Sequence, residues 1–514
     1  MLFRRIQEFL RPSTNASLMG SAVLILTTKV LGFGFAILLP LLLARRLTQQ
    51  EFGIYKQSFL VVSTTLAVLA WSLAMSVFYF LPREPDRRNS VVCNVLALQS
   101  TAGLLLFAAL ALFPDMTRWI SRDGALVPYS RLIGLVIALW MAGSGLDTIL
   151  LANHDTRLYS LISVSLQVSK AGLLWVAGLV WGTVESLLTA AAGHGLVQVI
   201  CAYCYLSRRF PGFLTALDVK LLTRQLSYSA PMALSGVLLN LQFELHNYFI
   251  SYAFGAATFA IYSVGVFQLP LMNMLAESTT AVLMPRVSTL AQADDREGII
   301  ELTMRAFRKL QLVAFGLYGY LLVVREEFLL LIYTDQYRAS VPIFTINLAM
   351  LLLTSYMLLD PTLRAYPRYR FLLVLNRAVL AAGQVLLLRF LIARWGLPGA
   401  AVTVVVVTIL DQLMSLVLCG WILRLRWRHL SWLRDPAKTA LCALGATLMT
   451  ALSHEALAGQ SRWWILSLCA VVFGVFYGGL LLIWRVFSPE ELRLAARLPL
   501  VRSLPGVGKW RTQS

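Results

Sequence analysis

Long apolar runs alternate with short polar connections along almost the whole chain. A helix needs about 20 apolar residues to cross the hydrocarbon core of a bilayer, and these runs reach that length. Backbone groups in lipid must be hydrogen-bonded within their own element, and the runs are too long and continuous for barrel strands. The pattern predicts membrane spans at about 17–44, 53–81, 91–113, 129–152, 158–181, 186–206, 228–252, 257–283, 306–324, 340–360, 370–393, 397–422, 438–457 and 462–485. We therefore expect an all-α polytopic membrane protein with about 14 transmembrane helices.

Composition and charge support this class of protein. Of the 514 residues, 58% are hydrophobic and only 13% are charged, whereas a soluble domain has about 25% charged residues. The formal net charge of +19 would also suit nucleic-acid binding. The lysines and arginines, however, collect in alternate connections, which is the pattern of cytoplasmic loops. This pattern predicts that both termini are cytoplasmic, and nucleic acid is not an expected partner.

Short sequence echoes divide the chain into two similar halves. FGIY at 52–55 recurs as FAIY at 259–262, WG at 181–182 recurs at 395–396, and LPR at 81–83 has a weaker copy, MPR, at 284–286. Because each half contains an even number of spans, the halves share one orientation and are related by a pseudo-twofold axis along the membrane normal. We expect an N-terminal six-helix bundle at 1–206, a cytoplasmic linker at 207–227, a C-terminal six-helix bundle at 228–422, and two additional helices with a basic cytoplasmic tail at 423–514.

Several motifs carry a family resemblance along much of the chain. They are LARRL followed by EFGIY at 43–55, YSAP at 228–231, the stretch 248–288, the stretch 332–343 and GLPGAA at 396–401. With these motifs the sequence resembles the multidrug/oligosaccharidyl-lipid/polysaccharide (MOP) exporter superfamily, and within it the polysaccharide-biosynthesis flippases of the Wzx type. The resemblance implies two bundles around a cavity that opens alternately to each side of the bacterial cytoplasmic (inner) membrane. It also implies a lipid-linked glycan as cargo.

Two features of the lipid II flippase branch of this superfamily are missing. That branch has an Arg-Asp pair after a start that TKVLGF at 28–33 matches, but Gly34 and Phe35 follow here. It also has an arginine shortly before the Gln-Leu-Pro of the eighth helix, where this chain has VGVF at 264–267. These differences argue against a lipid II flippase, which is one of two alternatives; the other is a cation-coupled multidrug exporter of the same superfamily.

Three lysines lie inside predicted spans of the first half. Lys29 and Lys170 fall near the middle of their spans, and Lys56 falls near the outer end of its span. A charge at the bilayer centre costs about 2.5–3.5 kcal/mol, so such residues are candidates for function. Alternatively, the Lys56 side chain could extend so that its ammonium lies at the outer surface of the membrane that the helix spans. For a polyprenyl-diphosphate cargo, lysine would supply point charges to the phosphates, and we predict diphosphate binding by Lys29, Lys56 and Lys170.

Other charges within the spans are of mixed sign. They are candidates for coupling transport to protons or sodium, or for interhelical ion pairs, and comprise Asp147, Glu244, Glu277, Arg377 and Asp411. No Walker A, HExxH or GxSxG motif is present, and the five histidines are dispersed. We therefore expect no catalytic residue, no metal site and no cofactor.

These observations together predict a flippase rather than an enzyme. It would move a polyprenyl-diphosphate-linked oligosaccharide from the cytoplasmic to the periplasmic leaflet, by alternating access through a cationic central cavity, for surface polysaccharide biosynthesis. Its expected partners are the lipid-linked glycan, membrane lipids, and polysaccharide polymerase or assembly proteins.

Overall fold

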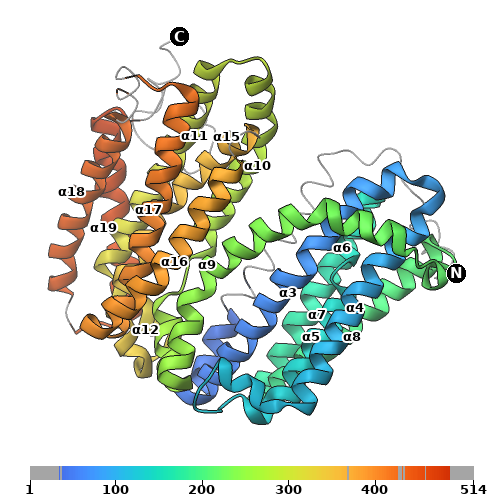
Figure 1. Ribbon diagram of the computed structural model, residues 1–514. Coiled ribbons are helices and arrows are strands. Elements are labelled where there is room, and N and C mark those ends of the chain that lie inside the picture. Colours follow the sequence, from blue (N-terminus) through green and yellow to red (C-terminus); the bar gives the residue numbers. More distant parts are fainter. Residues whose placement is uncertain are drawn as a thin grey trace, which may run out of the picture. The chain divides into compact units, whose positions relative to one another are not determined.

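A computed structural model describes residue 34 and residues 38–366, 370–426, 431, 434–457 and 459–486. Lys29 lies outside these residues. The regular structure of the described residues is helical (Figure 1). The α-helices are α3 (Gln49–Arg83), α4 (Arg88–Leu112), α5 (Ser130–Gly143), α6 (Leu146–Ala152), α7 (Thr156–Val180), α8 (Val184–Arg209), α9 (Val219–Gly265), α10 (Pro270–Gln292), α11 (Arg296–Val323), α12 (Arg325–Tyr333), α13 (Val341–Asn347), α14 (Ala349–Leu353), α15 (Asp360–Ala365), α16 (Arg370–Trp395), α17 (Leu397–Leu423), α18 (Arg434–Ala456) and α19 (Arg462–Ile483).

Ten helical segments within the described residues are long and apolar enough to cross a membrane. They are Gln49–Leu69, Pro85–Leu112, Val127–Ala152, Thr156–Val180, Val184–Arg209, Gly236–Gly265, Asp335–Ala365, Leu375–Trp395, Leu397–Leu423 and Arg462–Ile483. Each overlaps a span expected from the sequence, which confirms the all-α membrane class. The expected spans at 306–324 and 438–457 fall on α11 and α18, which are helical but not among the ten. Most of the first expected span lies outside the described residues, so the total of about 14 stays a prediction.

The contacts divide the chain into two compact units. Unit 1 extends to Val266 and includes Ile332–Ser340 and Val374–Val404. Unit 2 comprises Phe267–Leu331, Val341–Leu373 and the chain from Val405 onward. The domain boundaries drawn from the internal repeat stay a prediction.

The polar turn before α3 is a helix start. Thr48 is the N-cap, and its hydroxyl accepts a hydrogen bond from the backbone N–H of Glu51 at 3.3 Å. The Glu51 carboxylate in turn accepts the backbone N–H of Thr48 at 2.9 Å. This reciprocal capping box satisfies two donors that would otherwise be unpaired at the helix end, so the turn fixes where α3 begins.

In unit 1, α3 packs along α9, α4 along α5, and α5 and α7 each along α8. The contact of α3 with α9 is very close at one point, because a Cβ atom on Gly53 would lie 1.9 Å from the carbonyl oxygen of Ala256. The neighbouring Gly255 has φ 76° and ψ 178°, a conformation open to glycine, and kinks α9 there. This kink falls in the break that the sequence predicts between residues 252 and 257.

The expected span at 257–283 is not continuous. Its helix stops at Gly265 and resumes as α10 at Pro270, whose ring favours the first position of a helix. In unit 2 the Asn347 side-chain amide donates to the carbonyl oxygen of Phe267 at 3.1 Å and satisfies one group freed by this interruption. The segment from α13 to α15 also contains a 3-10 turn, Thr354–Leu359. Interrupted helices at membrane depth occur where protein or a water-filled cavity surrounds them.

The last two described helices are packed on α11 of unit 2. Tyr477 of α19 donates its hydroxyl to the carbonyl oxygen of Leu312 at 2.7 Å, and Tyr320 of α11 donates to that of Leu466 at 2.9 Å. A Cβ atom on Gly319 would lie 2.5 Å from Thr447 Oγ1, so α11 and α18 also approach closely. The addition outside the repeat is therefore an integral part of unit 2.

Candidate functional site

A row of ring contacts runs through unit 1. The ring centroids are separated by 6.1 Å for Phe52 and Tyr55, 4.8 Å for Tyr55 and Phe59, 6.1 Å for Phe59 and Trp140, and 5.7 Å for Trp140 and His194. The first three residues share one face of α3 because they are three and four positions apart. Trp140 and His194 come from α5 and α8. We call these five residues the aromatic row.

Two of the lysines predicted from the sequence lie on this row. The Nζ atom of Lys56 is 5.5 Å from the centroid of the Phe52 ring, and that of Lys170 is 4.6 Å from the Trp140 ring. Neither ammonium has an ion-pair partner among the described residues. A cation–π contact contributes about 0.5–2 kcal/mol, which is less than the roughly 2.5–3.5 kcal/mol that a charge costs at the bilayer centre. An anion would offset the remainder.

The surroundings of Lys170 are polar and partly unsatisfied. The Trp140 Nε1–H donates to the carbonyl oxygen of Ala191 at 2.9 Å and so fixes the ring under the ammonium. His194 is only 6% exposed, and its Nδ1 atom has no hydrogen-bond partner within the described part of the chain. The same is true of the buried Oε1 atom of Gln167, one turn before Lys170 on α7. Leaving a buried polar group unpaired costs about 1–3 kcal/mol, and a polar ligand bound here would recover part of that cost.

A second polar cluster adjoins Lys56 at the start of α3. The buried Gln57 amide donates to Ser251 Oγ at 2.9 Å and to Ser121 Oγ at 3.3 Å, which connects α3, α9 and the connection between α4 and α5. Asp123 Oδ2 accepts the backbone N–H of Ala256 at 3.3 Å, directly after the kink in α9. Asp123 lies outside the spanning segments. Burial acts to raise the pKa of its carboxyl, but hydrogen bonds from Ser121 and from the backbone of Ala125 and Ala256 outweigh burial and lower the pKa.

Two tyrosines from a much later part of the chain, Tyr333 and Tyr337, also pack against Phe52 at the start of the aromatic row. The ring centroids of Tyr333 and Tyr337 lie 6.4 Å and 5.7 Å from that of Phe52. The segment is held there by Gln336, whose amide donates to the carbonyl oxygen of Ala44 at 2.7 Å. Sequence reasoning used 332–343 only as part of the family resemblance and missed this docking. The pattern in the sequence that could have indicated this contact is two tyrosines four residues apart, with a glutamine beside the second.

The other predicted charges have local partners. Asp147 accepts a hydrogen bond from Ser163 Oγ at 3.1 Å, and Glu244 accepts one from the Asn247 amide at 2.8 Å. Each of the remaining three also takes part in an interaction, namely Glu277, Arg377 and Asp411. Their proposed roles in coupling stay predictions. Among the described residues, no three His, Cys, Asp or Glu side chains are arranged to hold a metal ion.

The sequence matches the polysaccharide biosynthesis protein family over residues 42–342, which is more than half of the chain. Among curated proteins, it is similar to the EPS I polysaccharide export inner membrane protein EpsE of Ralstonia nicotianae, with 25% identity over 199 residues. That match covers 37% of this chain and 45% of EpsE, so the chain spans about half the length of this relative.

Solved structures with the same fold are those of transporters. The lipid II flippase MurJ in its inward closed conformation aligns with a TM-score of 0.71 and 11% identity, over 90% of this chain and 98% of MurJ. An inward-facing multidrug resistance MATE transporter of the MOP superfamily aligns with a TM-score of 0.59 and 13% identity, over 76% and 94% of the two chains. A MOP superfamily transporter from Pyrococcus furiosus aligns with a TM-score of 0.54 and 13% identity, over 79% and 96%.

Identities this low establish the fold alone, whereas the family match covers most of unit 1 and includes the motifs at 43–55, 228–231 and 248–288. The fold is shared with these solved transporters. The chain therefore belongs to the polysaccharide biosynthesis protein family and is a membrane protein with the fold of the MOP exporter superfamily.

Proposed function

We propose that this protein is a flippase for a polyprenyl-diphosphate-linked oligosaccharide. It moves this lipid from the cytoplasmic to the periplasmic leaflet of the bacterial inner membrane for surface polysaccharide biosynthesis. The observation that carries the proposal is the placement of Lys56 and Lys170 on aromatic rings inside unit 1, without an ion-pair partner among the described residues. The family and the export protein EpsE support the same class of cargo.

The chemistry of the aromatic row suits both parts of such a headgroup. A diphosphate brings anionic oxygens that a lysine ammonium can bind, and Lys29 in the first predicted span would add a third cation. At 4 Å, an attraction between unit charges is about 4 kcal/mol at an effective dielectric constant of 20, so phosphates would offset the burial of the lysines. Trp140, which is only partly buried, would offer its aromatic ring to a sugar.

The proposed mechanism is alternating access through a cationic central cavity, with six-helix bundles proposed at 1–206 and 228–422. The driving ion is a proton or sodium taken up at one or more of the acids Asp147, Glu244, Glu277 and Asp411, with Arg377 as an ion-pair partner. Both termini face the cytoplasm, where polymerase or assembly proteins of the same pathway would meet the transporter.

The test is glycan display by cells that carry lysine variants. Lys56→Ala and Lys170→Ala are expected to reduce surface polysaccharide at least tenfold, while Lys170→Arg retains part of it because the charge is kept. Lys309→Ala on α11, an exposed lysine, is the matched control and should leave display unchanged. Protein levels are equalised by immunoblot.

Normal display by both alanine variants would remove the cationic-site proposal. A deletion strain with full surface glycan but raised drug sensitivity would instead identify a multidrug exporter. Accumulation of peptidoglycan precursor would identify a lipid II flippase.

A further inference from the structure

A three-layered stack lies at the end of unit 1 where α3 terminates. The guanidinium carbon of Arg83 is 3.9 Å from the centroid of the Tyr79 ring. Tyr79 in turn stacks on Tyr228 of α9, with centroids 4.3 Å apart and planes inclined by 27°. Phe80, only 4% exposed, touches both tyrosines with its edge and anchors them to the core. We call Arg83, Tyr79 and Tyr228 the arginine–tyrosine stack.

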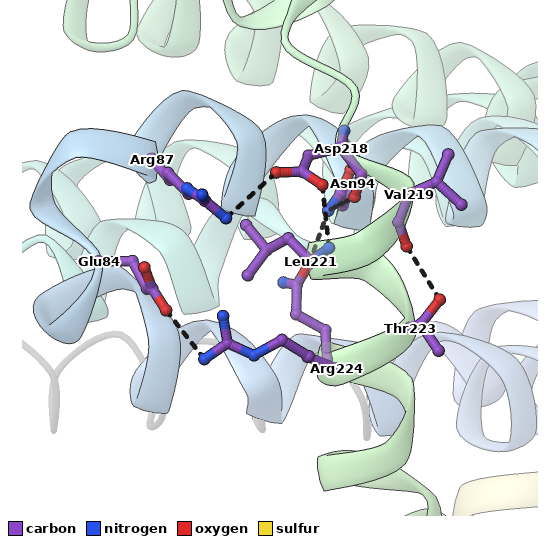
Figure 2. A network of polar contacts seen from close by, with 9 residues as sticks. Glu84, Arg87, Asn94, Asp218, Val219, Leu221, Thr223 and Arg224 are labelled. Carbon is purple, nitrogen blue, oxygen red and sulfur yellow. Dashed lines mark hydrogen bonds and ion pairs between the residues drawn. The ribbon is translucent and has the colours of Figure 1, made fainter.

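The backbone on both sides of this stack is firmly held. Figure 2 shows the polar network that fastens the start of α9 to the connection between α3 and α4. Arg224 pairs with Glu84 at 3.1 Å, and Arg87 pairs with Asp218 at 3.6 Å. The Asn94 amide also donates to the backbone oxygen of Asp218 at 2.9 Å. Tyr228 lies one turn after Arg224, so its ring is presented from a fixed helix.

Arg87 and Arg224 each pair with a carboxylate, whereas Arg83 has no carboxylate partner among the described residues. Its one recorded hydrogen bond is from Nη1 to the carbonyl oxygen of Tyr79 at 3.3 Å. A guanidinium has five N–H donors, so Arg83 has further donors besides the one bound to Tyr79, and a planar guanidinium can bind two phosphate oxygens at once. The tyrosines are 36% and 40% exposed, so the stack is accessible from outside the packed core.

Two further features concern the arginine of the stack: its location in unit 1 and its recurrence in the second half of the chain. This end of unit 1 carries Arg87, Arg88, Arg208 and Arg209, the excess of positive charge that marks a cytoplasmic face. The second copy of the Pro-Arg echo places Arg286 in a groove of about 460 Å³ between α10 and α11, lined also by Arg305 and by Glu301, which pairs with Arg305. An arginine thus stands at the same place in both copies of the echo, and only the first copy is part of a ring stack among the described residues.

We propose that the arginine–tyrosine stack is the cytoplasmic capture site for the diphosphate of the lipid-linked glycan. This inference rests on the proposed function and adds a binding step before the cargo reaches the aromatic row. Arg83 binds the phosphate oxygens through two N–H groups, and Tyr79 and Tyr228 are positioning residues that hold the guanidinium over the Tyr79 ring. A phospholipid headgroup offers similar phosphate chemistry, so the experiment separates the two sources.

The test is binding of geranylgeranyl diphosphate to the full-length protein in nanodiscs of phosphatidylcholine, followed by calorimetry. It is run in the Lys56→Ala, Lys170→Ala background, so that the aromatic row does not contribute. Arg83→Gln is expected to weaken binding at least tenfold, and Arg83→Lys less, because the lysine keeps the charge but not the paired donors. Tyr79→Phe should retain binding, whereas Tyr79→Leu should weaken it several-fold. Arg208→Gln, an exposed arginine at the same end, is the matched control and should leave affinity unchanged.

Equal affinity in Arg83→Gln and the parent protein would overturn the capture site. So would displacement of the probe by phosphatidylglycerol at the same concentration, which would identify an ordinary phospholipid site. Thermal unfolding of each variant confirms that the fold is kept. Failure of the proposed function would appear separately, as normal surface glycan in the lysine variants, and would leave the measured effect of Arg83 intact.

Discussion

The contact between α3 and α9 at Gly53 makes a quantitative prediction. A Cβ atom at this position would lie 1.9 Å from the carbonyl oxygen of Ala256 and 2.5 Å from its carbonyl carbon. Ordinary contacts between heavy atoms are about 3.5 Å, so Gly53→Ala requires the two helices to separate by roughly 1.5 Å. The backbone of Ala256 has little freedom to move, because Gly255 kinks α9 beside it and Asp123 binds its N–H.

Overpacking in a core costs about 1–3 kcal/mol, and a collision with backbone belongs at the upper end of that range. We therefore expect Gly53→Ala to lower the free energy of unfolding by about 3 kcal/mol. Gly172→Ala on α7 is the control, because a Cβ atom there would meet no heavy atom within 4 Å. An alanine in an open helical position is favoured by about 0.5–1 kcal/mol over glycine. The assay is thermal unfolding of the purified proteins in one detergent, monitored by tryptophan fluorescence. A Gly53→Ala variant as stable as Gly172→Ala would refute the close approach of the two helices.

Three further predictions concern the polar contacts. The pKa of the Asp123 carboxyl is lowered in the folded state, so its ionised form stabilises the fold. This stabilisation is fully present above the unfolded-state pKa of about 3.9 and is lost as the pH falls through the folded-state pKa. Asp123→Asn should therefore flatten the fall in melting temperature below about pH 4, and an unchanged acid profile would contradict the role of this carboxylate. Trp140→Phe removes the hydrogen bond to Ala191 but keeps a ring under Lys170, so it should retain more glycan export than Trp140→Leu, and equal export by the two would count against the cation–π contact. Tyr477→Phe should cost about 0.5–1.5 kcal/mol through loss of the bond to Leu312, and a melting temperature equal to that of the parent protein would argue against docking of α19 on α11.

Hydropathy and turn chemistry predict much of the fold. Thr48 and Glu51 signal the start of α3, and Gly255 marks the break in α9, because capping and positive φ depend on local sequence. Hydropathy does not reveal the stop at Gly265, since the residues on both sides of it are apolar and the freed carbonyl of Phe267 is satisfied by Asn347, 80 residues away. The interruptions between α13 and α15 were not predicted from hydropathy for the same reason.

The candidate site was predictable in part. Lys56 and Lys170 were visible because a charge within an apolar run is conspicuous. Their rings were not, because the partners of the row come from α3, α5 and α8, and only packing sets the register between those helices. The role of Gln57 was not predictable either, because its hydrogen-bond partners Ser121 and Ser251 come from two other parts of the chain.

The central claim is that Lys56 and Lys170 bind the diphosphate during translocation. The most direct measurement is transport of a fluorescent polyprenyl-diphosphate oligosaccharide by the purified protein in vesicles, with a membrane-impermeant quencher reporting the leaflet. We predict that Lys56→Ala and Lys170→Ala each slow transport at least tenfold, that the double variant is inactive, and that Lys309→Ala transports normally. Transport at the rate of the parent protein by the double variant would contradict the account.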